Sequence, residues 1–338
     1  MKTQNSNGRT VKLIGVAFLA MLALLGCYYA LFVAAIPRAE LEAQYFRPPS
    51  RYIDICYQAT AQGSQLCGVQ VHIRDTGPRD APALLLLHAS NASLFTWDAW
   101  RSRLDDRYRI VAMDFPGHGL TGAAGEQDLS EVALADFVRA VADKLHLQQF
   151  VLGGNSLGGA VAAHFAILYP QRVSGLILVD SGGPKPIANG DTGTESNIMR
   201  LLRAQIRDTL MAWIAPRFLV AKYLHFEYYR QDLITSALVD RVWQFNRMDG
   251  NRTLRRRAIL NDPWIRKYPD RIRARTLIIW GAHDRVFPLR GAQSFFQSIP
   301  GAKVVVLPDA GHHPQEESPD RSAALVRAFL GGTPVTNR

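Results

Sequence analysis

The residue with the clearest capacity for chemistry in this sequence is Ser156, which lies within the glycine-rich run 153–159, GGNSLGG. The apolar run Phe150–Leu152 before it predicts a buried strand, and the small apolar residues after it predict a helix. A serine at the tip of such a turn holds a strained backbone, and a Cβ at Gly154 or Gly158 would clash across the turn. The pattern predicts a nucleophile elbow, in which the hydroxyl of Ser156 is exposed beside a helix N-terminus.

A serine hydroxyl needs a general base, and the base needs a carboxylate that orients it. Asp284 follows the aliphatic run Leu277–Trp280, and His312 follows Val304–Leu307. Short apolar runs of this kind are typical of buried parallel strands, whose carboxyl ends bind ligands. We therefore expect His312 to accept the proton of Ser156, and Asp284 to hold the imidazole tautomer. The chain order serine, aspartate, histidine fits this arrangement.

From about Val69 to Leu330 the sequence resembles the α/β-hydrolase family, in the segments LLLLHAS, DFPGHGLT, GGNSLGG, LILVDSGG, WGAHDRVFP and DAGHHPQEESP. The resemblance implies a doubly wound, mostly parallel α/β sheet with an inserted helical cap, and catalysis without a cofactor. The family's Gly-His motif, followed by proline and glutamate, assigns the base to His312 rather than His313. In its asparagine before Ser156, the motif resembles the branch of the family that includes meta-cleavage-product C–C hydrolases. Esterases also share this asparagine widely.

The resemblance also implies an oxyanion hole of two backbone N–H groups. One is the amide of Leu157. The other belongs to the loop after Ala83–His88, where the family usually has His-Gly-x and the third residue donates. This chain has His88-Ala89-Ser90, so the Ser90 amide is the expected donor. Ala89 cannot adopt a glycine-only backbone cheaply, which leaves the shape of this loop open. We interpret His88 as a structural residue that hydrogen-bonds the loop backbone.

Other polar residues have alternative interpretations. Asp180 follows a predicted strand and is an alternative acid, although its Ser-Gly-Gly neighbours indicate a turn into the cap. Asp114 and His118 match a family loop in which they hold a turn, and His283 is expected to be solvated. The sequence shows no spaced cluster typical of a metal site, no dinucleotide fingerprint at Gly153–Gly159 and no nucleic-acid-binding module.

Strands and helices alternate along most of the chain, which predicts an α/β core over 51–183 and 274–332. Arg51–Tyr57 and Val69–Arg74 are expected to pair antiparallel at an edge of the sheet. Buried strands are predicted at Ala83–His88, Ile110–Met113, Phe150–Leu152, Leu176–Val179, Leu277–Trp280 and Val304–Leu307. Helices are predicted at Leu129–Leu147 with Ser130 as N-cap, at Leu157–Tyr169 and at Asp320–Leu330.

Residues 184–273 break this alternation and are expected to form a helical cap inserted after a strand. The segment has helical patterns, an excess of basic residues and the aromatic residues Trp213, Tyr223, Phe226, Tyr228, Tyr229, Trp243, Phe245 and Trp264. These side chains either line a pocket or lie on amphipathic helix faces. Arg255–Arg257 is interpreted as a solvated face rather than a carboxylate clamp.

Residues 1–36 are expected to be a cytoplasmic tail and a transmembrane signal anchor. The uncharged run Leu13–Ile36 exceeds the ~20 residues that span a bilayer as a helix. Basic residues precede it, so the positive-inside rule predicts a single pass through the inner membrane with the body in the periplasm or outside. A cleaved signal peptide, lipidation at Cys27 and a buried core helix are the alternatives. Residues 37–50, with three prolines, are expected to be a linker.

Cys56 and Cys67 lie close together in the sequence. They form a disulfide in an oxidising compartment or remain two packed thiols, and the sequence leaves both open. The 48% hydrophobic content excludes a disordered chain. The formal net charge of +10 is interpreted as a solvated surface or as membrane proximity.

These patterns predict a membrane-anchored serine hydrolase with a small-molecule substrate and a lipid bilayer as its partners. The substrate is expected to be an ester or lactone with an apolar acyl part, because the cap is rich in aromatic residues. The alternatives are C–C bond hydrolysis of the meta-cleavage-product type, cofactor-free haloperoxidase-like chemistry and a non-catalytic signalling or scaffold role. The intact set Ser156, Asp284 and His312 argues against the last.

Overall fold

The computed structural model describes residues 6–28, 34–59, 64–123, 127–182, 216–251, 269–289 and 297–332, together with residues 254 and 293. Its centre is an eight-stranded sheet in the order β1-β2-β4-β3-β5-β6-β7-β8. The strands are β1 (Ser50–Gln58), β2 (Gln65–Thr76), β3 (Ala83–Leu87), β4 (Arg109–Met113), β5 (Phe150–Asn155), β6 (Val173–Val179), β7 (Thr276–Gly281) and β8 (Lys303–Leu307). β2 pairs antiparallel with β1 and β4, and the other pairs are parallel. The predicted mostly parallel sheet is confirmed.

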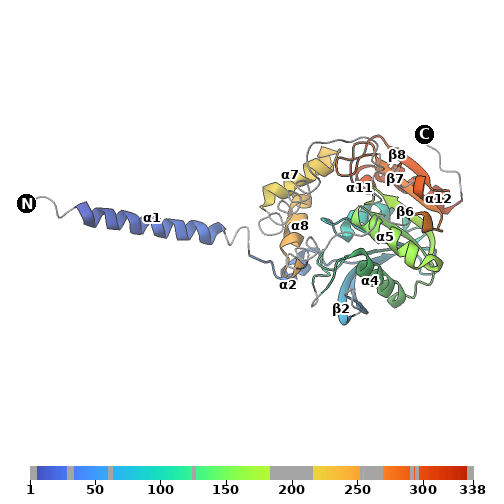
Figure 1. The fold of residues 1–338 in the computed structure, drawn as a ribbon, viewed down its shortest axis with the longest axis horizontal. Helices are drawn as coiled ribbons and strands as arrows, with labels where there is room; N and C mark the ends of the chain where they lie inside the picture. The colour runs from blue at the N-terminus through green and yellow to red at the C-terminus, as the bar shows by residue number, and fades with distance from the viewer. Residues whose placement is uncertain are drawn as a thin grey trace, which may run out of the picture.

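Helices cover both faces of the sheet (Figure 1). They include α3 (Asp98–Leu104), α4 (Glu131–Lys144), α5 (Leu157–Leu168), α11 (Pro314–Glu317) and α12 (Pro319–Leu330). The aliphatic strand β3 shows how two cores arise. Its Leu85 and Leu87 belong to the cluster that contains α4 and α5, whereas Leu84 and Leu86 belong to the cluster that contains α3 and α12. Successive side chains of a strand point to opposite faces, so a strand buried on both faces must be apolar throughout.

Two cap helices lie between β6 and β7 in the sequence, α7 (Arg217–Glu227) and α8 (Ser236–Arg247). Thr235 caps α8, because its side chain accepts a hydrogen bond from the amide of Leu238. The two helices share a small apolar cluster formed by Val220, Leu224, Tyr228, Val239 and Val242. Residues 184–215, 252–253 and 255–268 of the expected cap, which include Trp213, Trp264 and Arg255–Arg257, lie outside the described residues.

The stretch expected to be a linker, residues 37–50, contains a packed helix, α2 (Arg38–Tyr45). Leu41 is 1% exposed, and the Tyr45 hydroxyl donates to Gln244 of α8 at 2.6 Å. A backbone bridge also joins Ile36 to Met248, at the end of α8. Residues 37–50 therefore differ from a free linker, because Leu41 is buried and Tyr45 is bonded to the cap helix α8.

At the N-terminus, α1 (Ser6–Tyr28) extends away from the body (Figure 1). Its large apolar side chains are exposed, among them Leu13 at 70% and Leu24 at 71%. Within the described part of the chain, no helix is both long enough and apolar enough to cross a membrane. Residues 29–33 of the predicted spanning run lie outside the described residues. The predicted transmembrane anchor is therefore not supported by the fold.

Cys56 and Cys67 face each other on the edge hairpin of β1 and β2 and are joined by a disulfide. Cys27 of α1 is an exposed free thiol. The structure thus contains the disulfide, which is one of the two alternatives that the sequence leaves open for Cys56 and Cys67.

Replacing both Cys56 and Cys67 by serine is expected to lower the free energy of unfolding by about 2–3 kcal/mol, because the bond constrains a short loop in the unfolded chain. Chemical denaturation of the full chain in detergent, without reductant, measures this change. Cys27→Ser is the matched control and should keep the wild-type midpoint. Equal midpoints for the double variant and the wild type would show that the two thiols are not bonded in solution.

Candidate active site

The candidate site lies where the parallel strands end. β5 leads into Ser156, β6 into Asp180, and the loops after β7 and β8 carry Asp284 and His312. The register of the sheet places the ends of these four strands side by side. Residues that are far apart in the sequence therefore meet at one edge of the sheet, as expected for the site of an open α/β fold.

Ser156 occupies a strained turn with φ 55° and ψ −116°. A Cβ at Gly154 would lie 2.2 Å from the backbone of Gly158, and a Cβ at Gly158 would lie 2.2 Å from the Leu87 carbonyl oxygen. Neither position accepts any residue but glycine without a shift of the backbone. Strain of this kind persists only where the surrounding structure enforces it, and it concentrates at functional sites.

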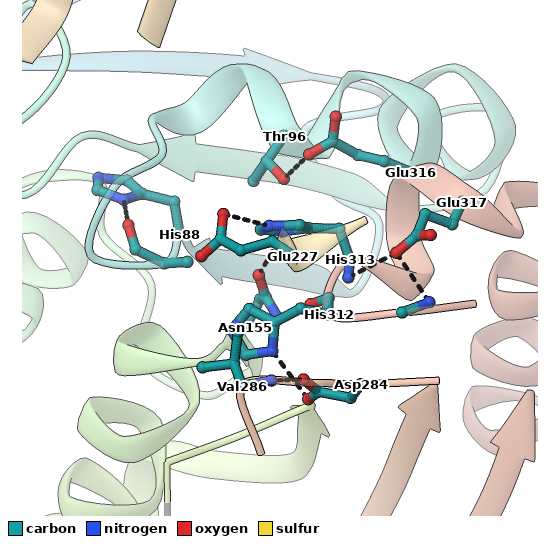
Figure 2. A network of polar contacts seen from close by, with 12 residues as sticks. His88, Thr96, Asn155, Glu227, Asp284, Val286, His312, His313, Glu316 and Glu317 are labelled. Carbon is teal, nitrogen blue, oxygen red and sulfur yellow. Dashed lines mark hydrogen bonds and ion pairs between the residues drawn. The ribbon is translucent and has the colours of Figure 1, made fainter. Parts of the chain in front are cut away.

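His312 and Asp284 form a buried hydrogen-bonded pair, with 2.8 Å between Nδ1 and Oδ2 (Figure 2). The other Asp284 oxygen accepts hydrogen bonds from the amides of Val286 at 2.7 Å and Phe287 at 2.9 Å. Burial raises the pKa of Asp284, but the hydrogen bond and the charge of His312 outweigh it and hold that pKa below its usual value. The Asp284 carboxylate is thus ionised, and Nε2 of His312 is left to accept a proton.

Asn155, at the end of β5, connects this strand to the loop that carries His312. Its side-chain amide donates to the carbonyl oxygens of Val179 and His312, both at 3.0 Å. The His312 amide in turn donates to the carbonyl oxygen of Glu227, at 3.0 Å. Within the described residues, the Ser156 hydroxyl makes no hydrogen bond. A bond from this hydroxyl to His312 would then have to form in the substrate complex, as is common for enzymes without a bound ligand.

The expected oxyanion loop is held by two histidines. His88 donates through Nδ1 to the Ala89 carbonyl oxygen at 2.7 Å and accepts at Nε2 from the Phe115 amide at 3.0 Å. His118 donates through Nε2 to the Ser90 carbonyl oxygen at 2.7 Å. Ala89 is not in the left-handed backbone region, so alanine fits this loop without strain. In the part of the chain described, the amides of Ser90 and Leu157 have no hydrogen-bond acceptor.

His313, the neighbour of His312, forms a buried ion pair that the sequence did not reveal. Its Nε2 lies 3.3 Å from a carboxylate oxygen of Glu227, at the end of α7 (Figure 2). Burial lowers the pKa of His313, but the hydrogen bond and charge of Glu227, with the charges of Glu316 and Glu317, raise it to about 9. His313 is therefore an imidazolium at neutral pH. Its partner lies in the cap, where no local sequence signal marks it.

Glu317 joins the cap to the histidine loop. One carboxylate oxygen accepts hydrogen bonds from the amides of Gly311 at 2.9 Å and His313 at 3.0 Å. The other accepts from the amides of Tyr229 at 2.7 Å and Arg230 at 2.9 Å. A buried carboxylate is stable when several N–H groups donate to it. The glutamate that follows Gly-His-x-Pro in the sequence was the available signal for this residue.

A small pocket lies between the cap helices, the expected oxyanion loop and the histidine loop, and it is lined by His313 rather than by Ser156 or His312. The cap contributes the apolar side chains Leu224, Leu238 and Val242, and the charged lining includes Arg241 and Glu316. Of the cap aromatics that the structure describes, Tyr228 alone lines this pocket. Phe226 and Tyr229 are exposed instead, at 46% and 42%. The apolar character of the pocket therefore comes mainly from aliphatic side chains.

The pair of His313 and Glu227 is expected to make stability depend on pH. A histidine whose pKa is raised on folding stabilises the folded state fully below its unfolded pKa, about 6.5, and this stabilisation is lost as pH rises through about 9. We expect the wild type to lose up to roughly 3 kcal/mol of unfolding free energy between these pH values. His313→Gln should be less stable at pH 6.5 and show a flatter profile.

Urea denaturation at a series of pH values measures the two profiles. His225→Gln, at an exposed histidine of α7, is the matched control and should keep the wild-type slope. A His313→Gln profile parallel to that of the wild type would mean that His313 is not charged in the folded protein.

A profile of the α/β hydrolase fold matches residues 82–319, which is more than half of the sequence. The chain belongs to the α/β-hydrolase fold family. This assignment, with the strand order and the elbow at Ser156, supports a hydrolase and leaves its substrate open.

Relatives carry different activities. The dihydrolipoyllysine-residue acetyltransferase component of the acetoin cleaving system of Pseudomonas putida is 29% identical over 263 residues, which cover 76% of this chain and 65% of that protein. The 2-hydroxy-6-oxononadienedioate/2-hydroxy-6-oxononatrienedioate hydrolase of Burkholderia vietnamiensis is 28% identical over 298 residues, covering 83% and 95%. A crystal structure of a membrane phospholipase A, a bacterial virulence factor, matches with a TM-score of 0.70 at 24% identity, covering 96% and 98%. At that identity the likeness concerns the fold.

Proposed function

We propose that the protein is a serine hydrolase that cleaves a carboxylic ester or lactone with an apolar acyl part. The observation that carries this proposal is the hydrogen-bonded pair of Asp284 and His312, tied through Asn155 to the strained turn of Ser156. A nucleophile, a base and an orienting acid on adjacent strand ends are what acyl transfer requires.

In the proposed reaction, the Ser156 oxygen attacks the carbonyl carbon while His312 Nε2 takes its proton. The tetrahedral intermediate places its negative oxygen between the amides of Leu157 and Ser90. It collapses to an acyl-enzyme, and the imidazolium of His312 gives its proton to the departing alcohol. Water then attacks the acyl carbon, with His312 again as base, and releases the acid. Asp284 stays ionised and stabilises the imidazolium throughout.

The lining of the pocket supports an apolar acyl group. Leu224, Leu238 and Val242 provide aliphatic surface close to the expected oxyanion loop, against which we expect an acyl chain to pack. The structural neighbour described as a membrane phospholipase A is consistent with an ester substrate, at the level of the fold.

A second candidate is hydrolysis of a C–C bond by the same three residues. It is favoured by the Burkholderia vietnamiensis relative, of which the alignment covers 95%. Ester hydrolysis and C–C bond hydrolysis would use the same nucleophile, so a comparison of substrates is needed to distinguish them.

Ser156→Ala is expected to lower kcat/KM for p-nitrophenyl esters at least about 10³-fold, because the acyl-enzyme can no longer form. A fluorophosphonate probe should label the wild type and not this variant. Ser102→Ala, at an exposed serine of α3, is the matched control and should retain full activity and labelling.

Unlabelled wild type, or activity that survives in Ser156→Ala, would contradict a serine nucleophile. A kcat/KM for a meta-cleavage product that exceeds that for every ester of a series from acetate to palmitate would favour C–C hydrolysis instead.

We also propose that α1 attaches the protein to a lipid bilayer, with the body facing the periplasm or the exterior. Large apolar side chains lie exposed along α1, including Leu13, Phe18 and Leu24, and removing them from water is favourable. The disulfide of Cys56 and Cys67 suits an oxidising compartment rather than the cytoplasm.

The full chain is expected to float with phosphatidylglycerol–phosphatidylethanolamine vesicles in a density gradient and to resist a high-salt wash. A chain that begins at residue 34 should stay at the bottom, and so should a full chain with Leu19→Glu and Leu22→Glu. Flotation of the shortened chain to the same extent as the full chain would contradict attachment through α1.

A further inference from the structure

A second carboxyl group lies beside the pair of Asp284 and His312. Asp180 follows β6, is 0% exposed and has a φ of 37°, in the left-handed region. One carboxylate oxygen of Asp180, one of Asp284 and one ring nitrogen of His312 all lie within 4.8 Å of one another. Two carboxyl groups buried this close cannot both be ionised without a large cost, so they share a proton.

Backbone contacts hold Asp180 in this place. The amide of Gly281, at the end of β7, donates to both of its carboxyl oxygens, at 3.0 and 3.2 Å. The Asp180 amide donates to the carbonyl oxygen of Ile279 at 3.0 Å. On the other side, the Gly182 amide donates to the Ser156 carbonyl oxygen at 3.0 Å. The turn that carries Asp180 is therefore tied both to the acid loop and to the nucleophile.

The charges around Asp180 decide which carboxyl group holds the proton. Burial, followed by the charge and hydrogen bond of Asp284, raises the pKa of Asp180 well above its usual value, and Glu317 of α11 adds further repulsion. Asp284 faces His312 and two backbone amides, and its pKa is lowered. Asp180 is thus the neutral partner, and its O–H donates to the Asp284 carboxylate.

We propose that Asp180 is a positioning residue that fixes Asp284 by this hydrogen bond, and that it replaces Asp284 as the partner of His312 when Asp284 is removed. The inference rests on the proposed roles of Ser156 and His312. Without Asp284, the nearest negative charge that opposes ionisation of Asp180 is gone. His312 then favours the ionised form, because the Asp180 carboxylate becomes the closest counter-charge for its imidazolium.

A double-mutant cycle tests this inference in the full chain, with kcat/KM for a p-nitrophenyl ester as the readout. Asp180→Asn should lose less than about tenfold, since its amide can donate to Asp284 and its carbonyl oxygen can accept from Gly281. Asp284→Ala should lose about 10- to 100-fold. The double variant should lose about 10⁴-fold, the scale expected when the base has no orienting acid. Asp143→Asn, at a surface aspartate of α4, controls for the change of charge.

The pH profile separates this role from a merely structural one. In Asp284→Ala, the pH profile of kcat should contain a rise that comes from the loss of the Asp180 proton, and the double variant should lack this component of the profile. Thermal unfolding checks that each variant is folded. If Asp284→Ala is unfolded, Asp284→Asn with and without Asp180→Asn replaces it, because the amide keeps the volume of the carboxyl group.

Equal activities of the Asp284 variant and the double variant would overturn the proposal, and so would a loss in Asp180→Asn as large as that in Asp284→Ala. If the wild type is active and is labelled by a fluorophosphonate, either result rejects only the role of Asp180. A wild type that is neither labelled nor active on any ester rejects the proposed function itself.

Discussion

The site depends on buried carboxylates that accept hydrogen bonds from backbone N–H groups. Asp284 accepts two such bonds, from Val286 and Phe287, and Glu317 accepts four. The amides that donate these bonds lie in loops, outside the strands and helices, so the bonds fix the loops in place. The loops that follow β7 and β8 therefore have defined shapes, and the imidazole of His312 is held against Asp284. Removing such a carboxylate would leave several buried donors without acceptors, each at a cost of about 1–3 kcal/mol.

The same contacts join the cap to the edge of the sheet that carries the candidate site. The end of α7 provides a carbonyl oxygen to His312 and a carboxylate to His313, and the residues after it donate to Glu317. A displacement of α7 would therefore disturb the backbone of His312. This end of α7 and the loop that carries His312 are therefore expected to move together.

The sequence was sufficient for the sheet, for the helices that cover it and for the tight glycine turn at Ser156. Hydrophobic runs of strand length and the glycines around Ser156 carry that information locally, and Ser130 caps α4 as expected. The sequence was not sufficient for α2, whose anchors Leu41 and Tyr45 stand among prolines and charges. It also did not reveal the partners of His313 and Asp180. Those depend on burial and on contacts between distant segments, which no local pattern records.

The contact between the N-terminal segment and α8 has a consequence for where the folded unit begins. Ile36 exchanges backbone hydrogen bonds with Arg247 and Asp249, and the Arg247 side chain donates to the carbonyl oxygen of Ala34. These bonds close the C-terminal end of α8. A protease cut near Ser50 would thus release more than α1. It would also separate from the body the segment that contains Ile36 and α2, which contacts α8 of the cap. Among the described residues, these contacts reach back to Ala34, sixteen residues before the first strand of the sheet.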